Sequence, residues 1–200
     1  LWSYVGISIG ADGASQMALE DLAMVRALPE SIVFYPSDAV STEKIVESCV
    51  NLKGIKYIRA TRANTPVIYN NTESFPVGEF KVLKSSKKDK AVLVGAGITL
   101  HECLKAANNL EANGLNVAVV DCYCIKPFDS SKFKELVKNS GGKIIVVEDH
   151  YKEGGIGEMI SSLLFNSKFE FKHLAVEKMP HSGQPEELLD KYNINSRAII

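Results

Sequence analysis

Asp12 is the acidic side chain best placed for chemistry in this 200-residue chain. The stretch from Ser8 to Asp21 is typical of a short strand, a Gly/Asp turn and then an amphipathic helix. Backbone N–H groups at a helix N-terminus lack intrahelical partners, so this position suits a capping carboxylate or a bound anion. Asp12 is therefore either a helix cap and turn former or a ligand contact. Gln16, in the first helical turn, is either a solvated side chain or part of the same site.

Arg62 is the cationic side chain that suits a phosphate. It follows the expected strand Lys56–Ala60 at its carboxyl end, where open parallel sheets place their ligands. The planar guanidinium makes two charge-assisted hydrogen bonds to a phosphate group. A surface ion pair is an equally good interpretation from position alone.

The glycines of Gly95-Ala96-Gly97 lie between an expected strand and an expected helix. The pattern resembles the start of a dinucleotide-binding loop, but Leu100 stands where the third glycine of that fingerprint would be. Tight packing of the helix against the strand is the simpler interpretation. No Ser/His/Asp order, metal-ligand cluster or Walker loop is present in the sequence.

The sequence Glu148-Asp149-His150 places two carboxylates and an imidazole at the end of an expected strand. Such a group can act as an acid/base cluster or an anion nest. Adjacent residues of a strand point in opposite directions, so the three side chains cannot converge on one substrate. We therefore interpret them as loop and interface architecture.

Alternating strand-like and helix-like segments predict an α/β fold with two successive open, mostly parallel sheets covered by helices, the first one incomplete. The expected strands are nearly continuous in hydrophobicity, as strands buried on both faces should be. They are Ile32–Tyr35, Lys56–Ala60, Ala91–Val94, Val117–Asp121, Ile144–Glu148 and His173–Val176. The expected helices include apolar stripes at Leu100–Ala107, Phe133–Val137 and Ile156–Leu164. Thr99 with Glu102 predicts a capping box.

The stretch from Ala63 to Lys90 breaks this alternation and predicts an extended connection, with a short added strand at Phe80–Leu83. We therefore divide the chain into a partial domain at 1–68, a linker at 69–90 and a second domain at 91–200. Because α/β domains normally run to about 100 residues or more, the first domain is expected to lack its N-terminal part.

The composition excludes several classes of partner. A formal net charge of −1 gives no bulk attraction to nucleic acid or to an anionic membrane. The run Lys84–Lys90 is interpreted as a solvated linker, and no apolar run approaches the roughly 20 residues of a membrane span. The four cysteines follow no zinc or disulfide-framework spacing. Cys122 and Cys124 are expected to share one face of a strand, and buried thiols in a soluble, cytoplasmic protein are the expected outcome.

Taken in order, the motifs of this chain resemble the transketolases, and in particular the animal form. They are Ser8–Asp21, Phe34–Asp38, Tyr57–Arg62, Val94–Glu102, Ile125–Asp129, Val147–Tyr151 and Gly154–Glu158. Each motif is weak by itself, but the ordered set is specific and covers nearly the whole chain without a large gap. The resemblance implies the end of a pyrimidine-binding domain, a linker and a complete transketolase C-terminal domain.

Transketolases transfer a two-carbon ketol unit between sugar phosphates, as in the pentose phosphate pathway, with thiamine diphosphate and Mg²⁺ or Ca²⁺ as cofactors. The resemblance implies that Asp12 hydrogen-bonds a sugar hydroxyl, Arg62 grips the substrate phosphate and Gln16 lines the thiamine site. It also implies a cytoplasmic homodimer, with dimer-forming surface on residues 1–68. Neither nucleic acid nor a membrane is an expected partner.

Three departures from the family pattern limit what this chain can do. The family has a substrate-contacting histidine eight residues before the motif aspartate, where this chain has Tyr4, which hydrogen-bonds but is a poor proton acceptor at neutral pH. Ala11 replaces an acid, and Ala14 replaces a proline. The activating glutamate, the ring-stacking aromatic residues and the diphosphate and metal ligands lie upstream in the family. We therefore predict no catalytic residue in this chain and no activity for it alone.

Two alternatives stay open. A non-catalytic transketolase-like binding or regulatory module is favoured by Tyr4 and Ala11, which weaken the substrate side of the pocket. Another thiamine diphosphate enzyme of the same superfamily, such as a deoxyxylulose-phosphate synthase or the β subunit of a 2-oxo acid dehydrogenase, shares the two-domain arrangement. The run from Gln16 to Asp21 favours transketolase over these sister enzymes.

Overall fold

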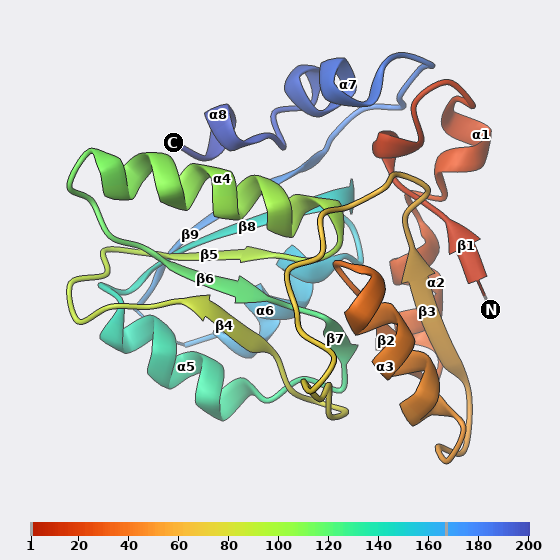
Figure 1. Cartoon of the computed structure of the whole chain (residues 1–200), viewed down its shortest axis with the longest axis horizontal. Coiled ribbons are helices and arrows are strands. Elements are labelled where there is room, and N and C mark those ends of the chain that lie inside the picture. Colours follow the sequence, from red (N-terminus) through yellow and green to blue (C-terminus); the bar gives the residue numbers. More distant parts are fainter. Residues whose placement is uncertain (1, 167) are drawn as a thin grey trace.

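The computed structural model of the chain describes residues 2–166 and 168–200, and Leu1 and Ser167 lie outside the described residues. The strands form two sheets, with helices over their faces (Figure 1). This arrangement confirms the expected α/β class. Within the described residues, no helix is both long enough and apolar enough to cross a membrane.

The first sheet has the strand order β1–β3–β2–β7. Its first three strands are parallel to one another, and the last adds an antiparallel edge. The strands are β1 (Trp2–Tyr4), β3 (Lys56–Ala60), β2 (Ile32–Phe34) and β7 (Cys124–Lys126). The helices α2 (Asp21–Ala27) and α3 (Ala39–Cys49) come from the same N-terminal part of the chain. Because β7 lies far along the sequence, the second half of the chain contributes a strand to the first sheet.

The second sheet has the order β4–β6–β5–β8–β9 and is parallel except for its edge strand β4. The strands are β4 (Lys81–Lys84), β6 (Ala118–Asp121), β5 (Val92–Gly95), β8 (Lys143–Tyr151) and β9 (Glu170–Val176). Every strand expected from Ile32 onward is present, with its ends shifted by at most three residues. The added strand expected at Phe80–Leu83 is observed as β4.

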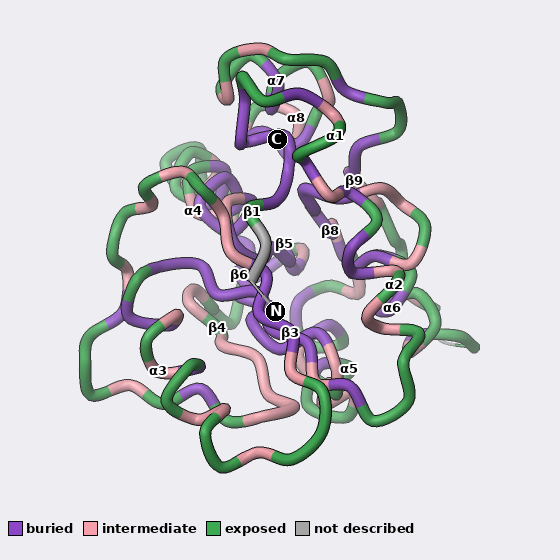
Figure 2. The backbone as a smooth tube through the Cα atoms, turned by 90° about the vertical axis from the view of Figure 1, so that its right-hand side faces the viewer, coloured by how far each residue is buried: buried purple, intermediate pink, exposed green. Residues whose placement is uncertain are grey.

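Alternate residues of the second sheet face two separate hydrophobic cores. Leu93 and Val119 belong to one core, and Val94 and Val120 belong to the other. The first core is covered by α4 (Ile98–Ala112), α7 (Pro185–Lys191) and α8 (Ser196–Ile199), and the second by α5 (Ser130–Asn139) and α6 (Ile156–Leu163). Figure 1 shows these helices on opposite sides of the sheet, and Figure 2 shows buried segments along its central strands. Burial on both faces explains the continuously apolar strands.

The N-terminal segment differs from the prediction. The short strand expected at the beginning of the stretch Ser8–Asp21 is instead a 3₁₀ turn, η1 (Ile7–Ile9), and the first strand lies earlier, as β1. The amphipathic helix expected after the turn is split into α1 (Ala14–Met17) and α2. The break occurs at Ala18, whose φ is +43°, and it redirects the chain so that Asp21 becomes buried.

The expected capping box at Thr99 and Glu102 is not formed. Gly97 is the N-cap of α4, and no side chain caps that helix. The buried Thr99 hydroxyl donates instead to the carbonyl of Val147 on β8, at 2.8 Å. Glu102 accepts from the backbone N–H of Ser196 at 2.8 Å. Both side chains connect α4 to other elements, because each finds a partner across the core rather than at its own helix end.

Cys122 and Cys124 do not share a strand face, contrary to the prediction. β6 ends at Asp121 and β7 begins at Cys124, so the chain passes from the second sheet to the first between the two thiols. Cys122 packs in a core of the second sheet, and Cys124 packs in a separate core with residues of α3. All four cysteines are free, and three are buried. Burial raises the pKa of the Cys124 thiol to about 11.

Gly97 is held against the first sheet. An added Cβ atom at Gly97 would lie 2.2 Å from the Tyr35 ring, and the φ of this glycine is +55°. At Gly95, a Cβ atom would lie 2.7 Å from the backbone nitrogen of Leu100. These close approaches support tight packing as the reason for the glycines between β5 and α4.

Gly97→Ala is expected to lower the free energy of unfolding by about 1–3 kcal/mol more than Gly114→Ala, because only the first adds an overpacked contact. Gly114 is a matched control, since its φ is +80° and no atom lies within 4 Å of its added Cβ position. Urea unfolding of both variants measures the difference. Equal losses of unfolding free energy in the two variants would show that the Tyr35 ring does not restrict the side chain allowed at position 97.

Candidate functional site

The Asp12 carboxylate and the Arg62 guanidinium form an ion pair across fifty positions of the sequence. Asp12 lies in the turn between η1 and α1, and Arg62 follows β3. Gly13, not Asp12, is the N-cap of the four-residue α1, and no side chain caps it. The helix-cap interpretation of Asp12 is therefore not borne out. The structure does bring together the two residues that the sequence singles out.

The Asp12–Arg62 pair is accessible. The Asp12 side chain is 40% exposed and the Arg62 side chain is 56% exposed. Within the described residues, Nη1 is the only guanidinium nitrogen of Arg62 that contacts a protein acceptor. A guanidinium carries five N–H donors in a planar fork. Most of that fork therefore stays open to an oxyanion.

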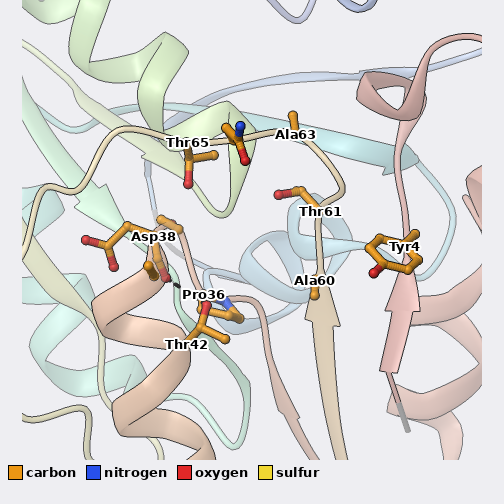
Figure 3. A pocket seen from close by; sticks show the side chains of 11 residues that line it. Tyr4, Pro36, Asp38, Thr42, Ala60, Thr61, Ala63 and Thr65 are labelled. Atoms are coloured by element: carbon orange, nitrogen blue, oxygen red, sulfur yellow. Dashed lines mark hydrogen bonds between the residues drawn. The ribbon is translucent and has the colours of Figure 1, made fainter.

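A cavity of about 580 Å³ lies at the carboxyl ends of β1, β3 and β2 (Figure 3). Tyr4 lines it from the end of β1, and Asp38 lines it from the start of α3. Thr61 and Ala63, the two chain neighbours of Arg62, also line it. Tyr4 is 67% exposed. This edge of the sheet is where open parallel sheets bind their ligands.

Asp38 lines this cavity but is not a free acid. Its carboxylate caps α3 by accepting from the backbone N–H of Ser41 at 2.7 Å. It also accepts from the N–H groups of Ile68 and Tyr69, at 2.9 and 3.0 Å. Burial acts to raise the pKa of Asp38, but these hydrogen bonds outweigh burial and hold the pKa below its ordinary value. Asp38 therefore stays charged and fastens the segment after β3 onto α3.

Asp121, at the end of β6, is a buried carboxyl group that links the second sheet to the cavity wall. It accepts from the Ser37 hydroxyl at 3.0 Å and from the Tyr69 hydroxyl at 2.7 Å. Burial raises the pKa of Asp121 to about 7, because the two hydrogen bonds offset the lost solvation only in part. Near neutral pH this carboxyl group is therefore close to its own titration point.

A buried charge cluster joins the two sheets. The fully buried Arg59 donates from Nε to both Asp21 oxygens, at 3.0 and 2.9 Å, and from Nη2 to the Asp149 carbonyl at 3.0 Å. The guanidinium carbon also lies 4.6 Å from the centre of the Tyr35 ring. Burial acts to lower the pKa of Arg59, but Asp21 and its neighbours outweigh burial and raise it. An arginine inside the apolar strand β3 is the sequence signal for such a cluster, because a buried charge needs a partner.

The side chains of Glu148, Asp149 and His150 have different partners, as the strand geometry predicts. Glu148 accepts from the backbone N–H of Ile156 at 2.6 Å, at the start of α6. Asp149 accepts from the backbone N–H of Ile7 at 2.7 Å. Burial lowers the pKa of His150, so this imidazole stays neutral near neutral pH. These contacts support the interpretation as interface architecture.

Gln16 is exposed on α1 and makes no side-chain hydrogen bond to the described part of the chain. Residues 2–166 and 168–200 contain no group of three or more His, Cys, Asp or Glu side chains that could hold a metal ion. The candidate site thus consists of a cation, a carboxylate and the hydroxyl groups around the cavity. These groups suit a phosphorylated ligand that also carries hydroxyl groups.

Comparison with known proteins covers nearly the whole chain. The family profile of the transketolase pyrimidine binding domain matches residues 1–67, and that of the transketolase C-terminal domain matches residues 78–199. The chain is 50% identical over 199 residues to the transketolase-like protein 1 of Bos taurus, and 50% identical over 198 residues to the transketolase of Homo sapiens. These alignments cover 99% and 98% of this chain, and 33% and 32% of the relatives.

One solved structure with a similar fold is a split gene transketolase, described as an inactive beta4 tetramer. It matches with a TM-score of 0.85 and 34% sequence identity, over 95% of this chain and 61% of that chain. The fold defines an α/β protein with a cavity and an exposed ion pair at the carboxyl edge of a parallel sheet. Together with this fold, the profiles and relatives show that the chain belongs to the transketolase family. The chain spans about a third of the length of the curated relatives that it matches.

Proposed function

We propose that this chain supplies the sugar phosphate-binding end of a transketolase, an enzyme that transfers a two-carbon ketol unit between sugar phosphates. The observation that carries the proposal is the accessible Asp12–Arg62 pair beside the cavity at the strand ends. Arg62 binds the substrate phosphate through its open N–H groups. Asp12 accepts a hydrogen bond from a sugar hydroxyl. Tyr4 lines the cavity at the position of the family histidine and donates a hydrogen bond rather than accepting a proton.

The cofactor side of the site is only partly present in this chain. Thiamine diphosphate with Mg²⁺ or Ca²⁺ supplies the carbanion chemistry of the reaction when it is bound to the whole enzyme. Among the described residues, no cluster fits the metal. Gln16, which is exposed on α1, is the residue that we assign to the thiamine site. The work of this chain is therefore to bind and orient the sugar phosphate, and no catalytic residue is assigned to it.

We further propose that the chain is inactive alone and works as part of a homodimeric cytoplasmic enzyme. The split gene transketolase that it resembles was solved as an inactive beta4 tetramer, which supports inactivity of such a portion by itself. Large exposed apolar side chains on residues 2–68 supply a surface for association. They include Tyr4, Met24, Val50, Ile55 and Val67. The division into 1–68, 69–90 and 91–200 is part of this proposal.

A non-catalytic binding or regulatory module is the second candidate function. The observation that favours it is Tyr4, which lines the cavity with an aromatic ring, at a position where the resemblance implies a histidine. Such a module would bind the sugar phosphate and yet fail to support transfer when joined to the upstream part of the enzyme. Another thiamine diphosphate enzyme of the superfamily would instead use pyruvate as donor. Product analysis with pyruvate or xylulose 5-phosphate distinguishes these outcomes.

Arg62→Ala is expected to weaken binding of xylulose 5-phosphate by roughly ten- to a hundredfold, because charge-assisted hydrogen bonds to the phosphate are lost. Arg197→Ala is the control, since Arg197 also forms an exposed ion pair, with Asp190, and neither residue lines the cavity. Titration of the chain followed by NMR measures both affinities. Equal affinity of the two variants, or wild-type signals that change at Arg197 rather than at Arg62, would contradict the proposal.

A further inference from the structure

The segment that carries Asp12 is a closed loop. The backbone N–H of Gly6 donates to the carbonyl of Met17 at 2.8 Å, and the N–H of Gly10 donates to the carbonyl of Ile7 at 3.0 Å. We call residues 6–19 the Asp12 loop. It begins two residues after Tyr4 on β1, so the geometry of this loop sets where Asp12 lies relative to the cavity and to Arg62.

The second sheet holds the start of the Asp12 loop through Asp149 on β8. The fully buried Asp149 carboxylate accepts from the N–H of Ile7 at 2.7 Å and from the N–H of Ser8 at 3.4 Å. An added Cβ atom at Gly6 would lie 2.0 Å from the Asp149 carboxylate, so only glycine allows this approach. The φ of Gly6 is +87°, a conformation that favours glycine as well.

Two further backbone contacts hold the same loop from the second half of the chain. The N–H of Gly183, before α7, donates to the carbonyl of Gly10 at 3.3 Å. The N–H of Tyr151, at the end of β8, donates to the carbonyl of Leu19 at 3.2 Å. Apolar residues of η1 and α7 also belong to one core. Contacts from the second half of the chain therefore hold the loop near its start, its middle and its end.

The charge on Asp149 is itself supported. Its own backbone carbonyl accepts from Arg59 Nη2, and the guanidinium of Arg59 attracts the carboxylate. Burial raises the pKa of Asp149, while Arg59 and the N–H groups of Ile7 and Ser8 oppose that rise. The two N–H groups donate to different oxygens of Asp149, whereas an amide side chain offers only one acceptor oxygen.

We propose that Asp149, on the second sheet, is a positioning residue that fixes the Asp12 loop and thereby the contact between Asp12 and Arg62 at the sugar phosphate site. The functional meaning of this inference rests on the proposed function. The C-terminal part of the chain is then a structural requirement of the substrate site, although none of its side chains lines the cavity at the strand ends.

Hydrogen exchange measured by NMR on the 200-residue chain tests the anchor. In the wild type, the Ile7 amide is expected to exchange as slowly as Val146 in β8. In Asp149→Asn, exchange at Ile7 and Ser8 is expected to become at least tenfold faster relative to Val146, because a charged acceptor is lost. The guanidinium signal of Arg62, which reports its contact with Asp12, is expected to move toward that of a free arginine. Gly6→Ala, which displaces the same contact from the loop side, is expected to give the same changes.

Glu148→Gln is the matched control, because Glu148 is the buried neighbour of Asp149 but caps α6 instead. It is expected to speed exchange at Ile156 and to leave Ile7 and Arg62 unchanged. Fast exchange of the Ile7 amide in the wild type would contradict the proposed hydrogen bond from Ile7 to Asp149. That result does not depend on whether any variant folds. Faster exchange at Ile7 with an unchanged Arg62 signal would overturn the positioning role.

The dependence on the proposed function is tested separately with xylulose 5-phosphate. Asp149→Asn is expected to weaken its binding roughly tenfold, and Glu148→Gln is expected to leave it unchanged, because a displaced Asp12 loses its alignment with the sugar. A wild-type chain that does not bind the sugar phosphate would defeat the proposed function. The exchange and Arg62 measurements would still decide whether Asp149 positions the loop.

Discussion

Arg59→Met is expected to lower the free energy of unfolding by about 3–5 kcal/mol, the usual cost of removing one partner of a buried ion pair. The Arg59 side chain is completely buried, and its Nε donates to both oxygens of Asp21. Without the guanidinium, Asp21 keeps a buried negative charge with no cation, and the Asp149 carbonyl loses a donor. The loss of stability arises more from the unpaired buried charge of Asp21 than from the lost attraction between Arg59 and Asp21.

Urea unfolding measures this loss, and two comparisons locate its cause. Arg197→Met removes an exposed guanidinium from its ion pair with Asp190, so it is expected to change stability within experimental error. The double variant Arg59→Met with Asp21→Asn is expected to recover part of the loss, because no unpaired charge is left. A loss for Arg59→Met no larger than that for Arg197→Met would contradict the description of this cluster as a buried charge pair.

Asp121 is expected to make the chain less stable as the pH rises from about 5 to 8. In the folded chain its carboxyl group titrates near pH 7, whereas its ordinary pKa is 3.8. Between these values the folded chain binds more protons than the unfolded chain, so the free energy of unfolding falls with rising pH. The contribution of Asp121 to the free energy of unfolding is fully present below pH ~4 and is lost as the pH rises through ~7. It amounts to at most about 4 kcal/mol.

The measurement compares the wild type with Asp121→Asn by urea unfolding at pH 5, 6, 7 and 8. The variant keeps a neutral polar group beside Ser37 and Tyr69, whose hydroxyls can donate or accept. We expect the stability of the variant relative to the wild type to rise by about 2–3 kcal/mol between pH 5 and pH 8. Asp190→Asn, which alters an exposed carboxylate, is expected to leave the pH dependence as it is. Parallel curves for wild type and Asp121→Asn would show that Asp121 does not titrate in this range.

The central strands, such as β5 and β6, could be predicted because burial on both faces leaves a continuous apolar run. The predicted strand Lys56–Ala60 has the same first and last residues as β3, and Arg62 lies beyond its carboxyl end as expected. Proximity of Asp12 and Arg62 follows from the shared carboxyl edge of parallel strands. The contact between their charged groups could not be predicted from the sequence, because η1 rather than a strand leads into the turn that carries Asp12.

The parts that could not be predicted depend on contacts between distant segments. β7 has three residues and forms only because β2 offers an open edge to a connection far along the chain. The break at Ala18 accompanies the burial of Asp21 against Arg59, a tertiary contact that no local periodicity records. Arg59 itself carried a readable signal, because it is a charged residue in an otherwise apolar strand. Its partners, from α2 and β8, are set by the tertiary fold alone.

A ketol-transfer assay on a chimera tests the central claim most directly. The chimera joins the upstream two thirds of the human transketolase, which is 50% identical over the matched region, to these 200 residues. With thiamine diphosphate and Mg²⁺ bound, and xylulose 5-phosphate as donor, we expect transfer to an aldose phosphate. Arg62→Ala is expected to raise the KM for the donor by tenfold or more, while Arg197→Ala does not. A folded chimera that binds the cofactor but transfers no ketol unit, with Tyr4 or with Tyr4→His, would contradict the account.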